Sequence, residues 1–246
     1  MSKLGFIGLG IMGAPMAAHL IKAGHEVFLS TRSKVPAELL VGKAQTCASA
    51  SEVAQKADII FMMLPDTPDV AKVLFGDDGV AQGLSQSKTV VDMSSISPMD
   101  TKAFAQKINA LGCDYLDAPV SGGEVGAKAA SLTIMVGGPE ATFEKVKPLF
   151  ELMGKNITLV GGNGDGQTCK VANQIIVALN RGGGRSAAVR RQGRCRPGAR
   201  APSLDGWLRF VEDSRGARRA HGQAHLRSGL SHRAASKRPE SGLGDR

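Results

Sequence analysis

Short apolar runs alternate with amphipathic stretches along the first two thirds of the chain. Apolar runs typical of strands cover residues 3–8, 26–31, 58–64, 89–93, 114–117, 131–136 and 157–160. Helical spacing covers residues 11–23, 69–75, 98–111 and 139–153. The run at 58–64 is apolar almost throughout, as expected for a strand buried on both faces. The alternation predicts an α/β fold, a Rossmann-type doubly wound parallel sheet with helices on both faces.

The composition changes near residue 180. Residues 1–180 hold 15 Lys and Arg, among which Arg32 is the single arginine, against 17 Asp and Glu. Residues 181–246 hold 16 Lys and Arg, 15 of them arginine, against 5 Asp and Glu, and they contain no Ile, Met or Asn. The net charge of +9 therefore arises from the last 66 residues, and the two parts need separate interpretations.

Several protein classes are disfavoured by the sequence. No run of 18 residues is free of charge and glycine, so we expect no transmembrane span and no membrane partner. The glycine-punctuated start is unlike a signal peptide. The four cysteines are scattered without a C-x-x-C pair, which disfavours a disulfide framework and a zinc site. We expect no metal and a reducing, cytoplasmic location.

The strongest motif is a glycine pattern between the first predicted strand and helix. Gly8 permits a tight turn, Gly10 lets the backbone approach a pyrophosphate, and Gly13 lets the helix pack on the strand. Ile11 and Met12 lie inside the same turn, where the N-terminus of the helix would face the phosphates. This context predicts a dinucleotide site; the alternative is a glycine-rich turn without a ligand.

The end of the second predicted strand indicates which dinucleotide binds. NAD sites usually place an acid there, whereas this chain has Ser30, Thr31, Arg32 and Ser33. A guanidinium beside two hydroxyl groups suits a 2′-phosphate. We therefore predict NADP(H) as the cofactor, with NAD as the second possibility, and contacts from Thr31 and Arg32. The alternative is that Arg32 is a solvated turn residue.

Two further segments follow predicted strands. Leu64 and Pro65 end one strand and Ser94 and Ser95 follow the next, so all four lie at the edge that lines the ligand crevice of such a sheet. Ser94 is equally suited to cap the helix that starts near residue 98.

The segment Ser121, Gly122 and Gly123 presents a hydroxyl and backbone N–H groups together. Such a nest suits a small carboxylate, and the alternative is an ordinary loop.

Lys170 and Asn173 follow a glycine-rich lead and share one face of a predicted helix. A lysine among apolar neighbours has a lowered pKa and exchanges protons near neutrality. The alternative is a solvated surface lysine.

These motifs together carry a family resemblance. They are, in order, GFIGLGIMGAPM at 5–16, MLP at 63–65, DMSS at 92–95, DAPVSGG at 117–123 and KVANQ at 170–174. From residue 2 to about 180 the chain resembles the β-hydroxyacid dehydrogenase family. DMSSI at 92–96 and SGGE at 121–124 are most similar to members that reduce 2-hydroxy-3-oxopropionate (tartronate semialdehyde) to glycerate. Dehydrogenases of 3-hydroxyisobutyrate and succinic semialdehyde reductases are the alternative within the family.

The resemblance implies a role for each site residue. Lys170 would be the general acid, and Asn173 would bind near the carbonyl oxygen. The substrate carboxylate would lie on Ser121, Gly122 and Gly123, and the nicotinamide half of the cofactor on Leu64, Pro65 and Ser95. Hydride addition creates an alkoxide, which a nearby ammonium stabilises and protonates.

One departure from the family is Ala130-Ser131, where relatives commonly carry glycine first. We expect little effect from it.

The resemblance implies a cofactor domain over residues 1–163 and the start of an interdomain helix over 164–180. The family continues with an all-helical, dimer-forming domain, whereas residues 181–246 lack helical periodicity. Permitted codons for 181–187, 205–221 and 232–244, read one base out of frame, encode family-like helices. We therefore interpret 181–246 as a frameshifted, disordered tail, and expect weak NADP(H) binding with little activity.

The alternative is a non-catalytic cofactor-binding protein whose basic tail binds nucleic acid. Trp207 and Phe210 are the only aromatic residues of the tail, which gives little support to base stacking. We therefore expect a small hydroxy or oxo acid as the partner and no specific nucleic acid. The family is homo-oligomeric, but the part that forms the dimer is missing from the tail.

Overall fold

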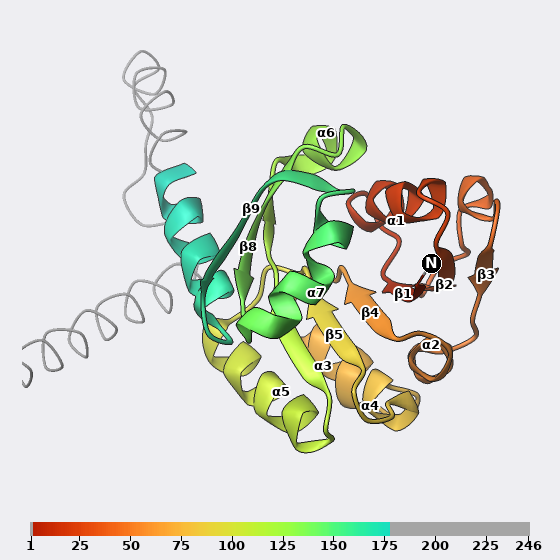
Figure 1. Cartoon of the computed structure of the whole chain (residues 1–246), viewed down its shortest axis with the longest axis horizontal. Helices are drawn as coiled ribbons and strands as arrows, with labels where there is room; N and C mark the ends of the chain where they lie inside the picture. The colour runs from red at the N-terminus through yellow and green to blue at the C-terminus, as the bar shows by residue number, and fades with distance from the viewer. Residues whose placement is uncertain (1, 178–246) are drawn as a thin grey trace, which may run out of the picture. The chain divides into compact units, whose positions relative to one another are not determined.

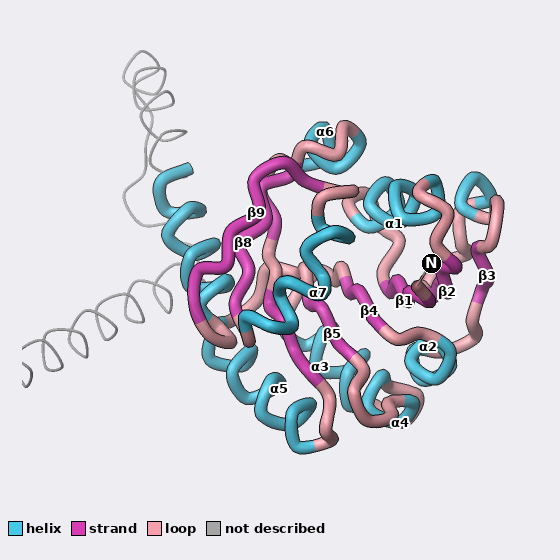
Figure 2. Tube along the Cα trace, viewed as in Figure 1, coloured by secondary structure: helices cyan, strands magenta, loops and turns pink. Residues whose placement is uncertain are grey.

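The structure, a computed structural model, describes residues 2–177 of the chain (Figures 1 and 2). The predictions for the tail over 181–246, including its frameshifted origin and its disorder, lie outside the described residues. So does the end of the predicted interdomain helix.

A nine-stranded sheet forms the centre of the described part (Figure 2). Its strands are β1 (Lys3–Ile7), β2 (Glu26–Ser30), β3 (Ala44–Thr46), β4 (Ile59–Met62), β5 (Thr89–Asp92), β6 (Asp114–Asp117), β7 (Val120–Ser121), β8 (Leu132–Gly137) and β9 (Gly154–Gly161). The order is β3-β2-β1-β4-β5-β6-β8-β7, with β9 paired to β8. The Rossmann-type prediction is confirmed over β1 to β6, which pair in parallel. Beyond β6 the sheet is mixed, because β8 runs antiparallel to β6 and β7.

Helices cover both faces of this sheet (Figure 1). They are α1 (Gly13–Lys22), α2 (Ala50–Lys56), α3 (Thr67–Phe75), α4 (Val80–Gly83), α5 (Pro98–Ala110), α6 (Gly123–Lys128) and α7 (Glu140–Phe150). A further helix begins at residue 165 and is described as far as residue 177; we call it the Lys170 helix. Helices α1, α6 and α7 lie on one face, and α2 to α5 lie on the other.

Two hydrophobic clusters, one on each face, hold these layers together. Side chains of β4 alternate between them: Ile59 and Phe61 enter the cluster under α1 and α7, while Ile60 and Met62 enter the cluster under α2 to α5. The Phe61 ring stacks on Phe6 with centroids 6.1 Å apart. This alternation explains why the run at 58–64 is apolar almost throughout.

Short elements were missed by the hydrophobic pattern. The predicted helix at 139–153 ends earlier, at Phe150, and α2 was not predicted. A local signal for α2 was present, because Ser49 Oγ accepts from Glu52 N (3.1 Å) and the Glu52 carboxylate accepts from Ala48 N (2.7 Å). Ser49 and Glu52 have the spacing of a capping box, although the glutamate here accepts from Ala48 N rather than from Ser49 N. This spacing marks a helix start even when the helix is too short to show periodicity.

Ala130 adopts a backbone conformation that favours glycine. Its φ is +50°, in the left-handed region, directly after the end of α6. A Cβ in this region costs roughly 1–2 kcal/mol. The backbone at this position thus favours the glycine that relatives carry, and the expectation that alanine matters little stays a prediction.

We predict that Ala130→Gly raises the free energy of unfolding by about 0.5–1 kcal/mol. The substitution removes the steric strain of the Cβ at positive φ, and this gain exceeds the entropic cost of glycine. Urea unfolding of the full chain measures the change. Ala129→Gly is the matched control, since Ala129 has φ −85° and should lose stability on the same substitution. Equal destabilisation by both substitutions would show that the conformation at Ala130 carries no strain.

Candidate cofactor and active site

The turn between β1 and α1 is crowded at two glycines and open at the third. A Cβ on Gly8, whose φ is +94°, would overlap the carbonyl oxygen of Met63, and a Cβ on Gly13 would overlap that of Gly8. Nothing lies within 4 Å of the Cβ position of Gly10. The first turn of α1 carries no acidic residue and no side-chain cap, and Ile11 is 67% exposed beside it. This geometry leaves a helix N-terminus accessible to an anion.

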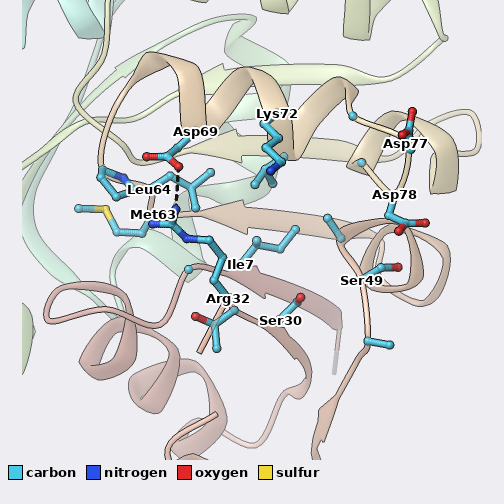
Figure 3. Close-up of a pocket in the computed structure, with 18 residues that line it drawn as sticks. Ile7, Ser30, Arg32, Ser49, Met63, Leu64, Asp69, Lys72, Asp77 and Asp78 are labelled. Carbon is cyan, nitrogen blue, oxygen red and sulfur yellow. Dashed lines mark hydrogen bonds and ion pairs between the residues drawn. The ribbon is translucent and has the colours of Figure 1, made fainter. Parts of the chain in front are cut away.

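A cavity of about 530 Å³ lies next to this turn, between the ends of β1, β2 and β4 and helix α3 (Figure 3). Its lining includes Gly8, Ser30, Thr31, Arg32, Leu64, Pro65, Asp69 and Lys72. Cavities of roughly 300–1,000 Å³ are typical of small-molecule and cofactor sites. Five predicted cofactor residues from three separate loops thus line one cavity: Gly8, Thr31, Arg32, Leu64 and Pro65. The other predicted cofactor residues lie outside its lining; they are Gly10, Ile11, Met12, Gly13 and Ser95.

Arg32 extends from the end of β2 toward α3 (Figure 3). Its Nη1 lies 3.2 Å from Oδ1 of Asp69, and its side chain is 82% exposed. An ion pair this exposed contributes little to stability. Arg32 is therefore an accessible cation at the mouth of the cavity, with Asp69 as a partner that the sequence did not predict.

The two loops after β4 and β5 are joined by a buried serine. Ser94 is fully buried, and its Oγ accepts a hydrogen bond from Leu64 N at 2.9 Å. Helix α5 is capped by Ser97, whose Oγ accepts from Asp100 N, so the alternative that Ser94 caps this helix is wrong. Ser95 is exposed, directly beside Ser94.

The Ser121 to Gly123 segment lies at the start of α6 and next to the Lys170 helix. Gly122 and Gly123 have φ of +134° and +60°, and nothing lies within 4 Å of the Cβ position of Gly123. The Nδ2 atom of Asn173 donates to Ser121 Oγ at 3.5 Å. The structure thus brings the predicted carboxylate loop and one predicted active-site side chain together.

Lys170 is 9% exposed, so the alternative of a solvated surface lysine is wrong. Burial lowers the pKa of its ammonium, because removal from water disfavours the charged form. Its Nζ donates to Oε1 of Gln174 at 3.0 Å, and Nδ2 of Asn173 donates to the same oxygen at 3.4 Å. Gln174 was missed by the sequence analysis, although its spacing of four residues from Lys170 was a signal.

The start of the Lys170 helix donates hydrogen bonds to a buried carboxylate. Asp117 is fully buried at the end of β6, where Oδ1 accepts from Gly164 N (2.7 Å) and Oδ2 accepts from Gln167 N (3.0 Å). Burial raises the pKa of Asp117 to about 6, even though these donors favour the ionised form. Nearby, the Tyr115 hydroxyl donates a hydrogen bond to Oδ2 of Asp92 at 3.0 Å. Burial also raises the pKa of Asp92.

No group of three or more His, Cys, Asp or Glu side chains between residues 2 and 177 is arranged to hold a metal ion. In the same range, no helix is long and apolar enough to cross a membrane.

Comparison with known proteins places this arrangement in a family. Residues 3–162 match the model of the NAD binding domain of 6-phosphogluconate dehydrogenase. The chain belongs to this family. Its relatives are named as dehydrogenases and reductases, so the family is one of oxidoreductases.

Three relatives illustrate the similarity. The chain is 65% identical over 178 residues to 2-hydroxy-3-oxopropionate reductase of Escherichia coli K12, a match that covers 72% of this chain and 61% of that protein. Mycobacterium tuberculosis 3-hydroxyisobutyrate dehydrogenase with L-serine matches with a TM-score of 0.68 and 36% identity, over 73% and 61% of the two chains. Psf3 in complex with NADP+ and 2-OPP matches with a TM-score of 0.71 and 28% identity, over 78% and 69%.

We predict that the free energy of unfolding falls as the pH rises through the pKa of Asp117. Its folded pKa of about 6 exceeds the ordinary 3.8, so the folded state holds this proton more tightly. The stabilisation is complete below pH 3.8, falls between 3.8 and 6, and is lost above 6, a change on the order of 3 kcal/mol.

The measurement is the free energy of unfolding by urea at pH values from 4 to 8, for the unaltered chain and for Asp117→Asn. Asparagine does not titrate, so the difference in free energy of unfolding between the two proteins should change by about 2 kcal/mol between pH 4 and 6. Parallel pH curves would contradict the assignment of the raised pKa to Asp117.

Proposed function

We propose that this chain binds NADP(H) and reduces 2-hydroxy-3-oxopropionate to glycerate. The observation that carries the proposal is the buried Lys170 ammonium on the same helix as Asn173, whose Nδ2 donates to Ser121 Oγ. The 65% identity to the E. coli reductase supports this substrate. The product follows from reduction of the aldehyde carbon to a primary alcohol.

The residues present fit a phosphorylated dinucleotide. The open position at Gly10 and the uncapped start of α1, with Ile11 and Met12, would receive the pyrophosphate. Thr31 and Arg32 would hold the 2′-phosphate, because a guanidinium offers two parallel donors to phosphate oxygens. Leu64, Pro65 and Ser95 would contact the nicotinamide half. When bound, NADPH supplies the hydride.

The chain's own residues handle the substrate and the proton. The N–H groups of Gly122 and Gly123 and the Ser121 hydroxyl would bind the carboxylate. Lys170 gives its Nζ proton to the carbonyl oxygen as the hydride reaches the aldehyde carbon, and Asn173 donates a hydrogen bond near that oxygen. The lowered pKa of Lys170 favours this transfer, because a desolvated ammonium is a stronger acid.

The chain spans about three fifths of the length of its E. coli relative. We propose three parts: a cofactor domain over residues 1–163, the start of an interdomain helix over 164–180, and a tail over 181–246 that arises from a one-base shift near codon 181. A tail of this origin would leave the site open to water, which slows turnover. Sequencing of codons 175–190 decides between a shifted frame and an intact one.

We predict that Arg32→Gln weakens NADPH binding by about tenfold or more, the loss expected for a charge-assisted hydrogen bond to phosphate. NADH binding should change less than twofold, since NADH has no 2′-phosphate. Fluorescence titration of both nucleotides on the full chain gives the two affinities. Lys22→Gln, which removes one exposed charge at the end of α1, is the control. Equal weakening of NADH and NADPH would refute 2′-phosphate recognition by Arg32.

We predict that Lys170→Met lowers the rate of 2-hydroxy-3-oxopropionate reduction by about 10²-fold or more, the typical contribution of a general acid. The rate is measured as NADPH oxidation in single turnover, with enzyme in excess over substrate so that slow chemistry is visible. Lys155→Met, an exposed lysine on β9, should leave the rate unchanged. Retention of the rate in Lys170→Met, or equal loss in both variants, would exclude Lys170 as the proton donor.

A further inference from the structure

Gln167 lies in the first turn of the Lys170 helix and is 1% exposed. Its Nε2 donates to Ser94 O at 2.7 Å, and its Oε1 accepts from Ile96 N at 3.1 Å. A backbone oxygen only accepts and a backbone N–H only donates, so one orientation of the amide satisfies both bonds. The two bonded peptide groups stand on either side of Ser95.

Ser94 extends this connection to a second loop. Its Oγ accepts from Leu64 N at 2.9 Å, and its own N–H donates to Asp92 Oδ1 at 3.0 Å. A continuous series of hydrogen bonds therefore runs from Leu64 through Ser94 to Gln167. Both loops at the proposed nicotinamide position are tied to one buried side chain.

The backbone of Gln167 is held from another direction. Its N–H donates to the buried carboxylate of Asp117 at 3.0 Å, at the end of β6. Lys170 follows Gln167 by three residues, less than one helical turn, so the direction of the lysine side chain depends on where this turn is fixed. Gln167 is thus the residue at which the helix meets both the β5 loop and β6.

We propose that Gln167 is a positioning residue that keeps the two nicotinamide loops and the Lys170 helix in one mutual geometry. Gln167 contacts Ser94 and Ile96, the neighbours of Ser95, rather than the reacting atoms, and acts through them. This role rests on the proposed function, because Gln167 would support both the loops at the hydride carrier and the helix of the proton donor. A displacement of about 1 Å between such groups costs on the order of 10²-fold in rate.

Hydrogen exchange of the full chain without cofactor tests the connection itself. Gln167→Met keeps the length and apolar volume of the side chain and removes both bonds. The amide of Leu64, two bonds away, should exchange about tenfold faster, while the Ile60 amide inside β4 reports any change in overall stability. Asn163→Leu is the matched control, because it removes a hydrogen bond to Tyr115 O at 2.6 Å in the neighbouring loop.

If Gln167→Met does not fold, Gln167→Glu replaces it, since a carboxylate keeps the bond from Ile96 N and loses the one to Ser94 O. Faster exchange at Leu64 than at Ile60 in the Gln167 variant, absent from Asn163→Leu, supports the proposal. Equal acceleration at Leu64 and Ile60, or no acceleration at Leu64, overturns it.

Ligand affinity separates this role from the proposed function. NADPH spans both halves of the site, whereas adenosine 2′,5′-bisphosphate reaches only the adenosine half. Gln167→Met should weaken NADPH by about tenfold and leave the bisphosphate within twofold. Equal weakening of both ligands overturns the positioning role. Failure of the unaltered chain to bind either ligand would refute the proposed function, while the exchange experiment would still decide whether the loops and helix are connected.

Discussion

A carboxylate buried away from water is tolerated only when donors surround its oxygens, and Asp117 meets this condition with two backbone N–H groups. Those groups belong to Gly164 and Gln167, where the Lys170 helix starts. The helix therefore begins where β6 ends and cannot shift without stripping Asp117 of its donors. A Cβ on Gly166 would overlap the carbonyl oxygens of Met135 and Asp117, so the junction also has no space for a larger residue.

The remaining site geometry follows from this junction and from the parallel part of the sheet. Strands β1, β2 and β4 end at the same edge of the sheet, and the loops that follow them line one cavity. Ser94 and Gln167 then tie the loops after β4 and β5 to the helix that begins at Asp117. Lys170, the proposed proton donor, and the loops at the proposed hydride carrier thus have a common support, although they are more than 70 residues apart in sequence.

Local patterns predicted much of this fold. The positions of β1, β2, β4, β5 and β6 could be read from apolar runs, because a strand buried on both faces has few polar residues. The glycine spacing at 8, 10 and 13 also predicted which positions are crowded and which is open. The antiparallel β8 was not predictable, because strand direction depends on connections that hydrophobicity does not encode.

The polar contacts were the least predictable part. The Arg32–Asp69 pair joins residues 37 apart, and the Gln167 amide bonds join residues 71 and 73 apart. Nothing in the local sequence distinguishes such side chains from solvated ones. The family resemblance pointed to Lys170 and Ser121, because they lie in recurring motifs. It gave no role to Gln167 or Asp117, which act on the backbone of their neighbours.

The most direct test of this account is a crystal structure of the full chain grown with NADP+. We predict the pyrophosphate at the N-terminus of α1, the 2′-phosphate on Arg32 in place of Asp69, and the nicotinamide ring beside Leu64 and Ser95. A substrate carbon placed about 3–3.5 Å from the ring would then have its oxygen within reach of Lys170 Nζ. A dinucleotide bound elsewhere, or a nicotinamide ring with no path to Lys170, would contradict the account.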